Sequence, residues 1–177
     1  GLGDVYKRQR MHSSSGGVFS ILAEQTIKQG GVVFGARFDE NWEVKHDYTE
    51  TIDGVSVFRG SKYVQSKTGD TFKQAEQFLK QNRKVLFSGT PCQIVALKRY
   101  LKKEYENLLL VDFICHGVPS PGVWRKYLKQ VIALTCDKNT VSSHLKLLLS
   151  ERNALVEGIS FRDLSLIHIS EPTRLRR

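Results

Sequence analysis

The sequence predicts an α/β protein: a central, mostly parallel but mixed sheet flanked by helices, in a single truncated domain. Two apolar runs, at 84–88 and 108–114, lie on either side of a helical pattern at 91–103. This strand–helix–strand order favours a parallel pair joined by a right-handed crossover. Two β-rich runs on either side of the turn at 39–41 predict an antiparallel hairpin in addition.

Each element is predicted by a local signal. Serines before a periodic apolar run cap a helix, and a glycine pair ends it. Alternation indicates strands, and apolar residues three and four apart indicate helices. The expected elements are, in chain order, a helix at 18–29, strands at 32–38 and 42–48, a loop with a short strand at 55–66, a helix at 70–81, a strand at 84–88, a helix at 91–103, a strand at 108–114, a loop at 116–121, a helix at 122–134, a helical turn at 145–149 and a strand at 156–162.

Two of these helices are predicted to be amphipathic. The apolar members are Val18, Ile21, Leu22 and Ile27 in the first helix, and Phe72, Ala75, Phe78 and Leu79 in the second.

The composition is that of an ordinary globular protein. The 177 residues are enough for one domain with a real core, and 40% of them are hydrophobic. No apolar stretch approaches the ~18 residues of a membrane span, and the start lacks the order of a signal peptide. Three cysteines do not form a disulfide framework, so reduced thiols or a cofactor fit better. We therefore expect a cytoplasmic protein without a membrane partner.

Both ends of the chain look foreign to the domain. Residues 1–9 (GLGDVYKRQ) and 164–177 (LSLIHISEPTRLRR) resemble translated sequencing adapters. We expect them to be non-native tails, and residues 10–163 to be a C-terminally truncated domain. The tails carry three of the nine net positive charges. The other six are scattered among acidic residues, which argues against nucleic acid as a partner.

Two cysteines follow the two central strands. Cys92 lies in FSGTPCQ, after the strand at 84–88, and Cys115 closes the strand at 108–114. Ligands of open α/β sheets bind at the carboxyl ends of the strands. If the strands are neighbours, ~5 Å apart, the thiols could share an iron–sulfur cluster or a metal ion. Each could instead be structural, since free cysteine is often simply buried.

The turn before Cys92 is typical of a helix start. Thr90 and Gln93 have the spacing of a capping box, and Pro91 falls at the first helical position. Cys92 then lies in the first turn, where the helix dipole favours the thiolate that binds a metal or attacks an electrophile.

Two further segments could bind an anion. Residues 13–17 (SSSGG) could present hydroxyls and N–H groups at a helix N-terminus, which suits a cofactor phosphate. An ordinary capped helix is the plainer interpretation. Residues 59–66 (RGSKYVQS) group two cations, several hydroxyls and one ring around a glycine, which suits a phosphate and a flat ring. A solvated loop is equally consistent with them.

Two polar residues near the second strand have more than one interpretation. His116 could act as a base or as a polar contact to a cofactor. Adjacent residues on an extended chain point to opposite sides, so Cys115 and His116 need not face the same cavity. Asp112 could form a local hydrogen bond or face a solvated surface of the sheet.

Five segments, in this order, resemble one family: SSSGGVFS, GGVVFGARFDE, RGSKYVQS, LFSGTPCQ and VDFICHGVPSP. The sequence resembles the coenzyme F420 hydrogenase/dehydrogenase beta-subunit family, mainly its C-terminal domain, over roughly residues 13–129. The resemblance implies an α/β fold with a central sheet. It also implies a flavin- and iron–sulfur-dependent oxidoreductase that passes electrons between FAD, a [4Fe–4S] cluster and a redox partner.

The resemblance implies roles for particular residues. Cys92 and Cys115 become candidate cluster ligands, and His116 is the candidate catalytic residue. The candidate cofactor-binding residues are Ser14, Ser15, Gly16, Gly17, Arg59, Gly60, Ser61, Lys62, Tyr63, Gln65, Gly89 and Thr90. The partners implied are an electron-transfer protein, such as a ferredoxin-like domain or subunit, and a small-molecule redox substrate.

The chain departs from the family's pattern in two ways. A [4Fe–4S] cluster usually takes four thiolates, whereas only Cys92 and Cys115 are well placed here. No C-x2-C-x2-C run is present either. Loss of flanking sequence on both sides would explain both departures.

Two other functions stay open. The first is a cysteine-dependent enzyme without a cofactor, in which Cys92 is the nucleophile and His116 the base. The second is a non-catalytic electron-transfer assembly module whose loops serve a partner.

Overall fold

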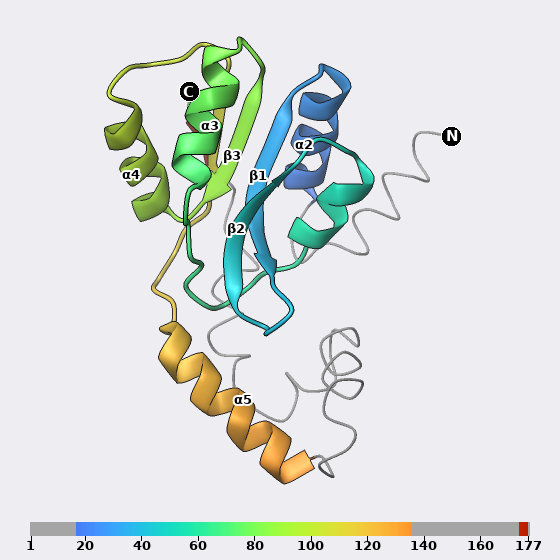
Figure 1. Ribbon diagram of the computed structural model, residues 1–177, viewed down its shortest axis with the longest axis vertical. Helices are drawn as coiled ribbons and strands as arrows, with labels where there is room; N and C mark the ends of the chain where they lie inside the picture. The colour runs from blue at the N-terminus through green and yellow to red at the C-terminus, as the bar shows by residue number, and fades with distance from the viewer. Residues whose placement is uncertain (1–16, 136–173, 177) are drawn as a thin grey trace.

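A mixed sheet lies at the centre of the computed structural model, which describes residues 17–135 and 174–176 (Figure 1). Its strand order is β2-β1-β3-β4-β5. Three strands run parallel in the middle, and an antiparallel strand flanks them on each side. The strands are β1 (Val32–Phe38), β2 (Val44–Thr49), β3 (Val85–Gly89), β4 (Leu108–Asp112) and β5 (Arg174–Arg176). The predicted α/β class, with a mixed sheet in a single domain, is confirmed.

Helices cover both faces of this sheet. Figure 1 shows α3 and α4 on one side and α2 on the other. The elements are α2 (Val18–Lys28), the 3₁₀ helix η1 (Asp53–Phe58), α3 (Thr71–Lys80), α4 (Pro91–Leu101) and α5 (Pro121–Thr135). In Figure 1, α5 extends away from the sheet and its covering helices.

Alternation along the strands divides the core into two clusters. Successive strand side chains point to opposite faces of a sheet. Phe34, Phe87 and Leu110 therefore pack with α3 and α4, whereas Leu86 and Val111 pack with α2 and η1. The central strands are buried on both faces, as parallel strands usually are.

The predicted apolar face of α2 is confirmed in part, because Leu22 and Ile27 pack against a core cluster whereas Val18 and Ile21 do not. Val18 is 42% exposed and Ile21 is 36% exposed, whereas Ser20, Ala23 and Thr26 are buried. The Thr26 hydroxyl donates to the Leu22 carbonyl at 2.8 Å, which satisfies it without water. Small residues thus bring this helix close to the sheet, and part of its apolar side stays exposed. The predicted apolar face of α3 is confirmed, because all four of its members lie in one core cluster.

The predicted short strand within 55–66 is wrong. Residues 53–58 form η1 instead, and Val55 and Phe58 lie three apart on its buried side, as a 3₁₀ helix requires. Gly35 of β1 makes room for this packing, because a Cβ there would lie 2.9 Å from Phe58 Cγ.

Several predictions fall outside the described residues. The helical turn at 145–149 and the strand at 156–162 are among them. Strand β5 lies within residues 164–177, the segment predicted to be a non-native tail, and it pairs antiparallel with β4. No helix within 17–135 has the length and hydropathy needed to cross a bilayer.

Candidate functional site

The two central strands end side by side. In the parallel register, Gly89 at the end of β3 pairs with Asp112 at the end of β4. The segments that carry Cys92 and Cys115 therefore leave the same edge of the sheet, as predicted. Asp112 is only 2% exposed, so its interpretation as a residue on a solvated surface is wrong. This edge brings two thiols and a buried carboxyl group to one region.

The start of α4 presents Cys92 to solvent. Pro91 is the first helical residue, and the Thr90 N–H donates to Gln93 Oε1 at 3.0 Å. The predicted role of Gln93 in the cap is thus confirmed. Cys92 follows in the first turn, is exposed, and has its Sγ 3.1 Å from the Thr90 hydroxyl. Cys92 thus lies at the positive end of the helix dipole.

A hydrogen-bonded chain of side chains lies behind this turn. His46, on β2, has its Nε2 2.9 Å from the Ser88 carbonyl and its Nδ1 2.9 Å from Ser66 Oγ. The Gln93 amide nitrogen donates to the same Ser66 hydroxyl at 2.8 Å. The chain thus connects β2, the loop after η1, the end of β3 and the start of α4. We call His46, Ser66 and Gln93 the polar relay.

Burial determines the protonation state of His46, the titratable residue of the relay. His46 is buried, and its ring stacks on Phe87 with the centroids 5.4 Å apart. Desolvation lowers the pKa of His46 below its usual value, although the bond to the Ser88 carbonyl opposes this. The imidazole is therefore neutral near pH 7.

Sequence reasoning missed the relay. Its members are far apart in the chain; Ser66 ends the predicted segment RGSKYVQS and Gln93 belongs to the predicted capping box, but His46 belongs to no recognised motif. The one available signal was the alternation of β2, which places His46 on the same buried side as Val44.

The polar relay packs closely against Gly89, where a side chain would crowd it. A Cβ on Gly89 would lie 3.0 Å from Gln93 Oε1 and 3.5 Å from His46 Nε2. Any side chain here would displace the Gln93 amide that caps α4, so the absence of a side chain at Gly89 is part of the site.

The loop at 59–66 lies against the start of α2. Arg59 Nε donates to Ser20 Oγ at 3.1 Å, and its guanidinium lies 3.7 Å from the Glu24 carboxylate. Gly17, in the left-handed conformation, immediately precedes the helix. The loop at 59–66 therefore contacts the first two turns of α2, and Gly17 is the one residue of the predicted segment at 13–17 that the structure describes. Ser14, Ser15 and Gly16 lie outside the described residues.

Lys62 is a largely buried cation of this loop. Its ammonium donates to the Val57 carbonyl at 3.1 Å and to the Arg59 carbonyl at 2.9 Å. Desolvation lowers the pKa of Lys62 to about 8. Gly60 has a φ of +79°, and no atom lies within 4 Å of where its Cβ would be. Ser61 is exposed and Tyr63 half-buried.

The loop after β4 completes the region. Cys115 is half-buried, and its Sγ accepts from the Gly117 N–H at 3.4 Å. The Gln65 N–H donates to the Pro119 carbonyl at 3.1 Å, which joins this loop to the loop at 59–66. His116 is exposed. Three of the five family-like segments are therefore in contact. Arg59 of RGSKYVQS contacts Ser20 of SSSGGVFS, and Gln65 of RGSKYVQS contacts Pro119 of VDFICHGVPSP.

Metal ligands are sparse in this region. Among residues 17–135 and 174–176, no group of three or more His, Cys, Asp or Glu side chains is close enough to hold a metal ion. Cys136 lies outside the described residues. Cys92 and Cys115 would therefore need additional ligands to hold a cluster.

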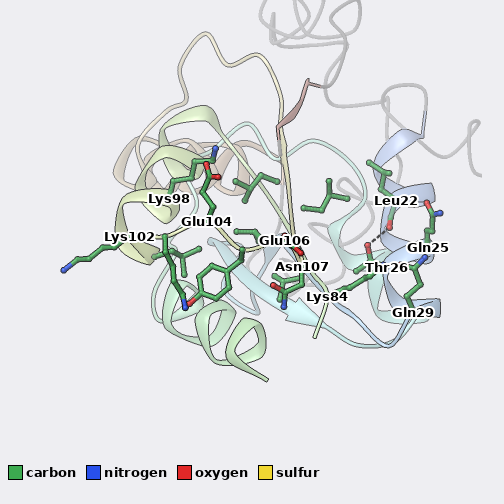
Figure 2. Close-up of a pocket in the computed structure, with 17 residues that line it drawn as sticks. Leu22, Gln25, Thr26, Gln29, Lys84, Lys98, Lys102, Glu104, Glu106 and Asn107 are labelled. Carbon is green, nitrogen blue, oxygen red and sulfur yellow. Dashed lines mark hydrogen bonds between the residues drawn. The ribbon is translucent and has the colours of Figure 1, made fainter. Parts of the chain in front are cut away.

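A groove also lies elsewhere on the described part of the chain. Figure 2 shows it between α2, the amino-terminal ends of β3 and β4, and the segment after α4, with a volume of about 1070 Å³. Thr26, Lys98 and Glu104 are among its lining residues, and it contains none of the predicted site residues. We place the candidate site at the carboxyl ends of the strands, because the thiols and the relay converge there and ligands of open α/β sheets bind at that edge.

Comparison with known proteins bears on the predicted family. Residues 82–144 match the family model described as the carboxyl terminus of the beta subunit of coenzyme F420 hydrogenase/dehydrogenase. The match includes both strand ends and both cysteines of the site. The predicted resemblance to this family is confirmed over this stretch, which holds two of the five segments, LFSGTPCQ and VDFICHGVPSP. No curated protein matches the sequence.

One solved structure adds information on the fold. The chain is similar to a chain of the F420-reducing [NiFe] hydrogenase complex from Methanosarcina barkeri, in a xenon-derivatised form, with a TM-score of 0.53. The sequences are 17% identical, and the similarity covers 76% of this chain and 48% of that one. This chain therefore spans about half the length of the solved chain. At this identity the likeness shows the fold alone.

Proposed function

Because residues 82–144 match the C-terminal domain of coenzyme F420 hydrogenase/dehydrogenase beta subunits, we propose that the chain is a redox domain that uses a flavin and an iron–sulfur cluster. In this proposal, electrons pass between FAD, a [4Fe–4S] cluster and a redox partner. The match of residues 82–144 to an oxidoreductase family supports the proposal, and the cofactors and the activity of this chain are the proposed part.

One observation carries the proposal. Gly89 and Asp112 are register partners, so the two cysteine-bearing segments begin next to each other at the carboxyl edge of the sheet. Two thiols at neighbouring strand ends form a better starting point for a cluster site than two thiols at random surface positions.

The contacts between the loop at 59–66 and α2 support a flavin site. Arg59 joins the loop to the first turns of α2, and Gly60 leaves open space beside the chain. A helix N-terminus beside a basic loop suits the diphosphate of FAD. Lys62 and Arg59 would offset the phosphate charge, although both cations also have protein partners. These residues fit the group.

The cluster is supported less completely. A [4Fe–4S] cluster is held by four cysteine thiolates, and the described residues supply Cys92 and Cys115. They do not form a complete site by themselves. Further ligands would come from Cys136, from sequence beyond this chain or from a partner protein.

The chain's own residues would bind and orient these groups. Bound FAD supplies hydride and electron chemistry, which no amino-acid side chain provides. Thr90 and Gln93 fix the first turn of α4 and thereby the position of the Cys92 thiol. The neutral His46 holds the relay without adding charge to the site.

The first test is an absorption spectrum of the anaerobically purified chain after reconstitution with FAD, ferrous iron and sulfide. We expect flavin bands and a broad iron–sulfur shoulder, both of which bleach with dithionite. A chain that keeps neither flavin nor iron would contradict the proposal.

Matched variants locate each cofactor. Lys62→Gln is expected to weaken FAD binding roughly tenfold, because a charge-assisted hydrogen bond contributes about 1.5–3 kcal/mol. Lys73→Gln, at an exposed position on α3, should leave it unchanged. Cys92→Ser and Cys115→Ser should each lower the iron content, whereas Ser56→Ala, at an exposed position on η1, serves as the comparison that keeps it.

The cofactor-free alternative makes a different prediction. If Cys92 is a nucleophile activated at the start of α4, a colourless protein should still react stoichiometrically with iodoacetamide at Cys92 at mildly acidic pH. His116→Ala should slow that reaction only if the imidazole acts as the base.

A further inference from the structure

The outer side of α4 is an exposed groove next to Cys92. The inner side of this helix packs Ile94, Leu97 and Leu101 into the core. Its outer side carries a shallow hollow lined by Pro91, Cys92, Val95, Ala96 and Arg99. These positions recur at helical spacing and form one stripe along the helix. Figure 1 places α4 on the outside of the helical layer that it shares with α3.

The stripe is unusually apolar for the outside of a helix. Val95 is 39% exposed, and Ala96 and Cys92 are exposed beside it. The outer side of a surface helix is normally charged or polar. A single exposed apolar residue needs no explanation, whereas here several apolar side chains line one shallow hollow beside an exposed thiol.

A band of positive charge borders the stripe. Four cations, Lys98, Arg99, Lys102 and Lys103, gather toward the C-terminal end of α4; Arg99 lines the hollow, and the three lysines line the neighbouring groove with Glu104 and Glu106. All four cations are exposed. Positive charge in the last turn complements the helix dipole, yet Arg99 also lines the hollow itself. An occupant of this surface should therefore carry negative charge.

We propose that the outer face of α4 is the docking surface for a small acidic electron-carrier protein. The inference rests on the proposed redox function, because it places the carrier directly against the exposed Cys92. The apolar stripe of α4 would be buried against the carrier. Arg99 and the neighbouring cations would attract the carrier's acidic surface.

The size of the surface fits such a partner. The 11 residues of α4 span ~16 Å at 1.5 Å per residue. Electron-transfer encounters lie at the small end of protein interfaces, below roughly 1,200 Å² of buried surface in total. A three-turn helix with a short apolar centre and a charged rim has the dimensions of a weak, transient complex.

The test measures binding of the full chain to a plant-type [2Fe–2S] ferredoxin, an acidic carrier, by isothermal titration calorimetry at 50 and 300 mM salt. We expect measurable binding at the low salt concentration and weaker binding at the high one. Val95→Asp and Arg99→Glu should each raise the Kd about tenfold. Lys73→Glu is the matched control, since it reverses an exposed charge on the neighbouring helix α3, and its Kd should change less than twofold.

Each outcome is decisive. Absence of binding, or equal Kd values for Arg99→Glu and Lys73→Glu in proteins with native circular dichroism, would overturn the inference. The result is separable from the cofactor test, because titration of ferredoxin needs no flavin or iron in this chain. A chain that holds FAD but ignores ferredoxin would retain the proposed function and lose this docking surface.

Discussion

Ser66 is the position where the polar relay can be broken with the smallest change. Its hydroxyl lies 2.9 Å from His46 Nδ1 and 2.8 Å from Gln93 Nε2. Ser66→Ala removes one oxygen atom and both contacts, while the backbone and the packing of neighbouring side chains stay the same. The substitution therefore tests whether the relay holds β2 and the start of α4 together.

The expected magnitude follows from these two contacts. Each intramolecular hydrogen bond contributes about 1 kcal/mol net, and a buried partner left unsatisfied costs more. His46 is buried, so its Nδ1 cannot turn to water. We expect Ser66→Ala to lower the free energy of unfolding by about 2 kcal/mol, which lowers the midpoint of thermal unfolding by about 4–8 °C in a chain of this size.

Equilibrium urea unfolding, followed by tryptophan fluorescence, measures this change. Ser56→Ala is the matched control, because Ser56 is an exposed serine in the neighbouring η1. It should shift the free energy of unfolding by less than about 0.5 kcal/mol, as surface substitutions usually do.

A double-mutant cycle then isolates the contact between Ser66 and Gln93. Residues that share a hydrogen bond show interaction energies of about 0.5–3 kcal/mol. If Ser66→Ala and Gln93→Ala add without interaction, or if Ser66→Ala unfolds like Ser56→Ala, the relay does not contribute to stability and our reasoning is refuted.

Three further predictions concern the same region and the anchoring of α5. Burial lowers the pKa of His46 in the folded state, so the unfolded state takes up the proton at a higher pH than the folded state does. The free energy of unfolding should therefore fall as the pH drops below 6.5, by up to about 1.4 kcal/mol per pH unit. Urea unfolding between pH 5 and 8 should show that the free energy of unfolding depends less steeply on pH in His46→Gln than in the unchanged protein. Gly89→Ala should lower stability by roughly 1–3 kcal/mol, because its Cβ would lie 3.0 Å from Gln93 Oε1, and an unchanged unfolding midpoint would show that Gln93 moves away without cost. Trp124→Phe removes the indole N–H that donates to the Trp42 carbonyl at 2.6 Å, so it should cost about 1 kcal/mol and lower the hydrogen-exchange protection of α5 but not of β3.

The family match bears on the cofactor experiments and not on the stability experiments at Ser66 and His46. It covers residues 82–144, which include β3, α4 and β4 but neither α2 nor the hairpin. Stability effects at Ser66 and His46 therefore report on this fold, whereas loss of flavin or iron in the cysteine and Lys62 variants reports on function. A variant that loses flavin or iron but keeps its free energy of unfolding separates an effect on function from an effect on the fold.

Local signals in the sequence determined most of the fold. The apolar runs at 84–88 and 108–114 with a helix between them indicated a parallel pair, and β3 and β4 pair in that way. Thr90, Pro91 and Gln93 placed the start of α4 correctly, because capping depends on neighbours three residues apart. The position of Cys92 followed from these two facts.

Only the tertiary structure decided what surrounds Cys92. His46, Ser66 and Gln93 come from three separate segments, and no local pattern indicates that their side chains meet. Residues 53–58 form a 3₁₀ helix because Val55 and Phe58 bury against β1 beside Gly35, a contact between distant segments. For the same reason, the fully buried residues of α2 are the small Ser20, Ala23 and Thr26, which lie closest to the sheet, whereas Phe19, Leu22 and Ile27 pack around them half-buried. Sequence patterns report on neighbours along the chain, whereas burial is set by neighbours across it.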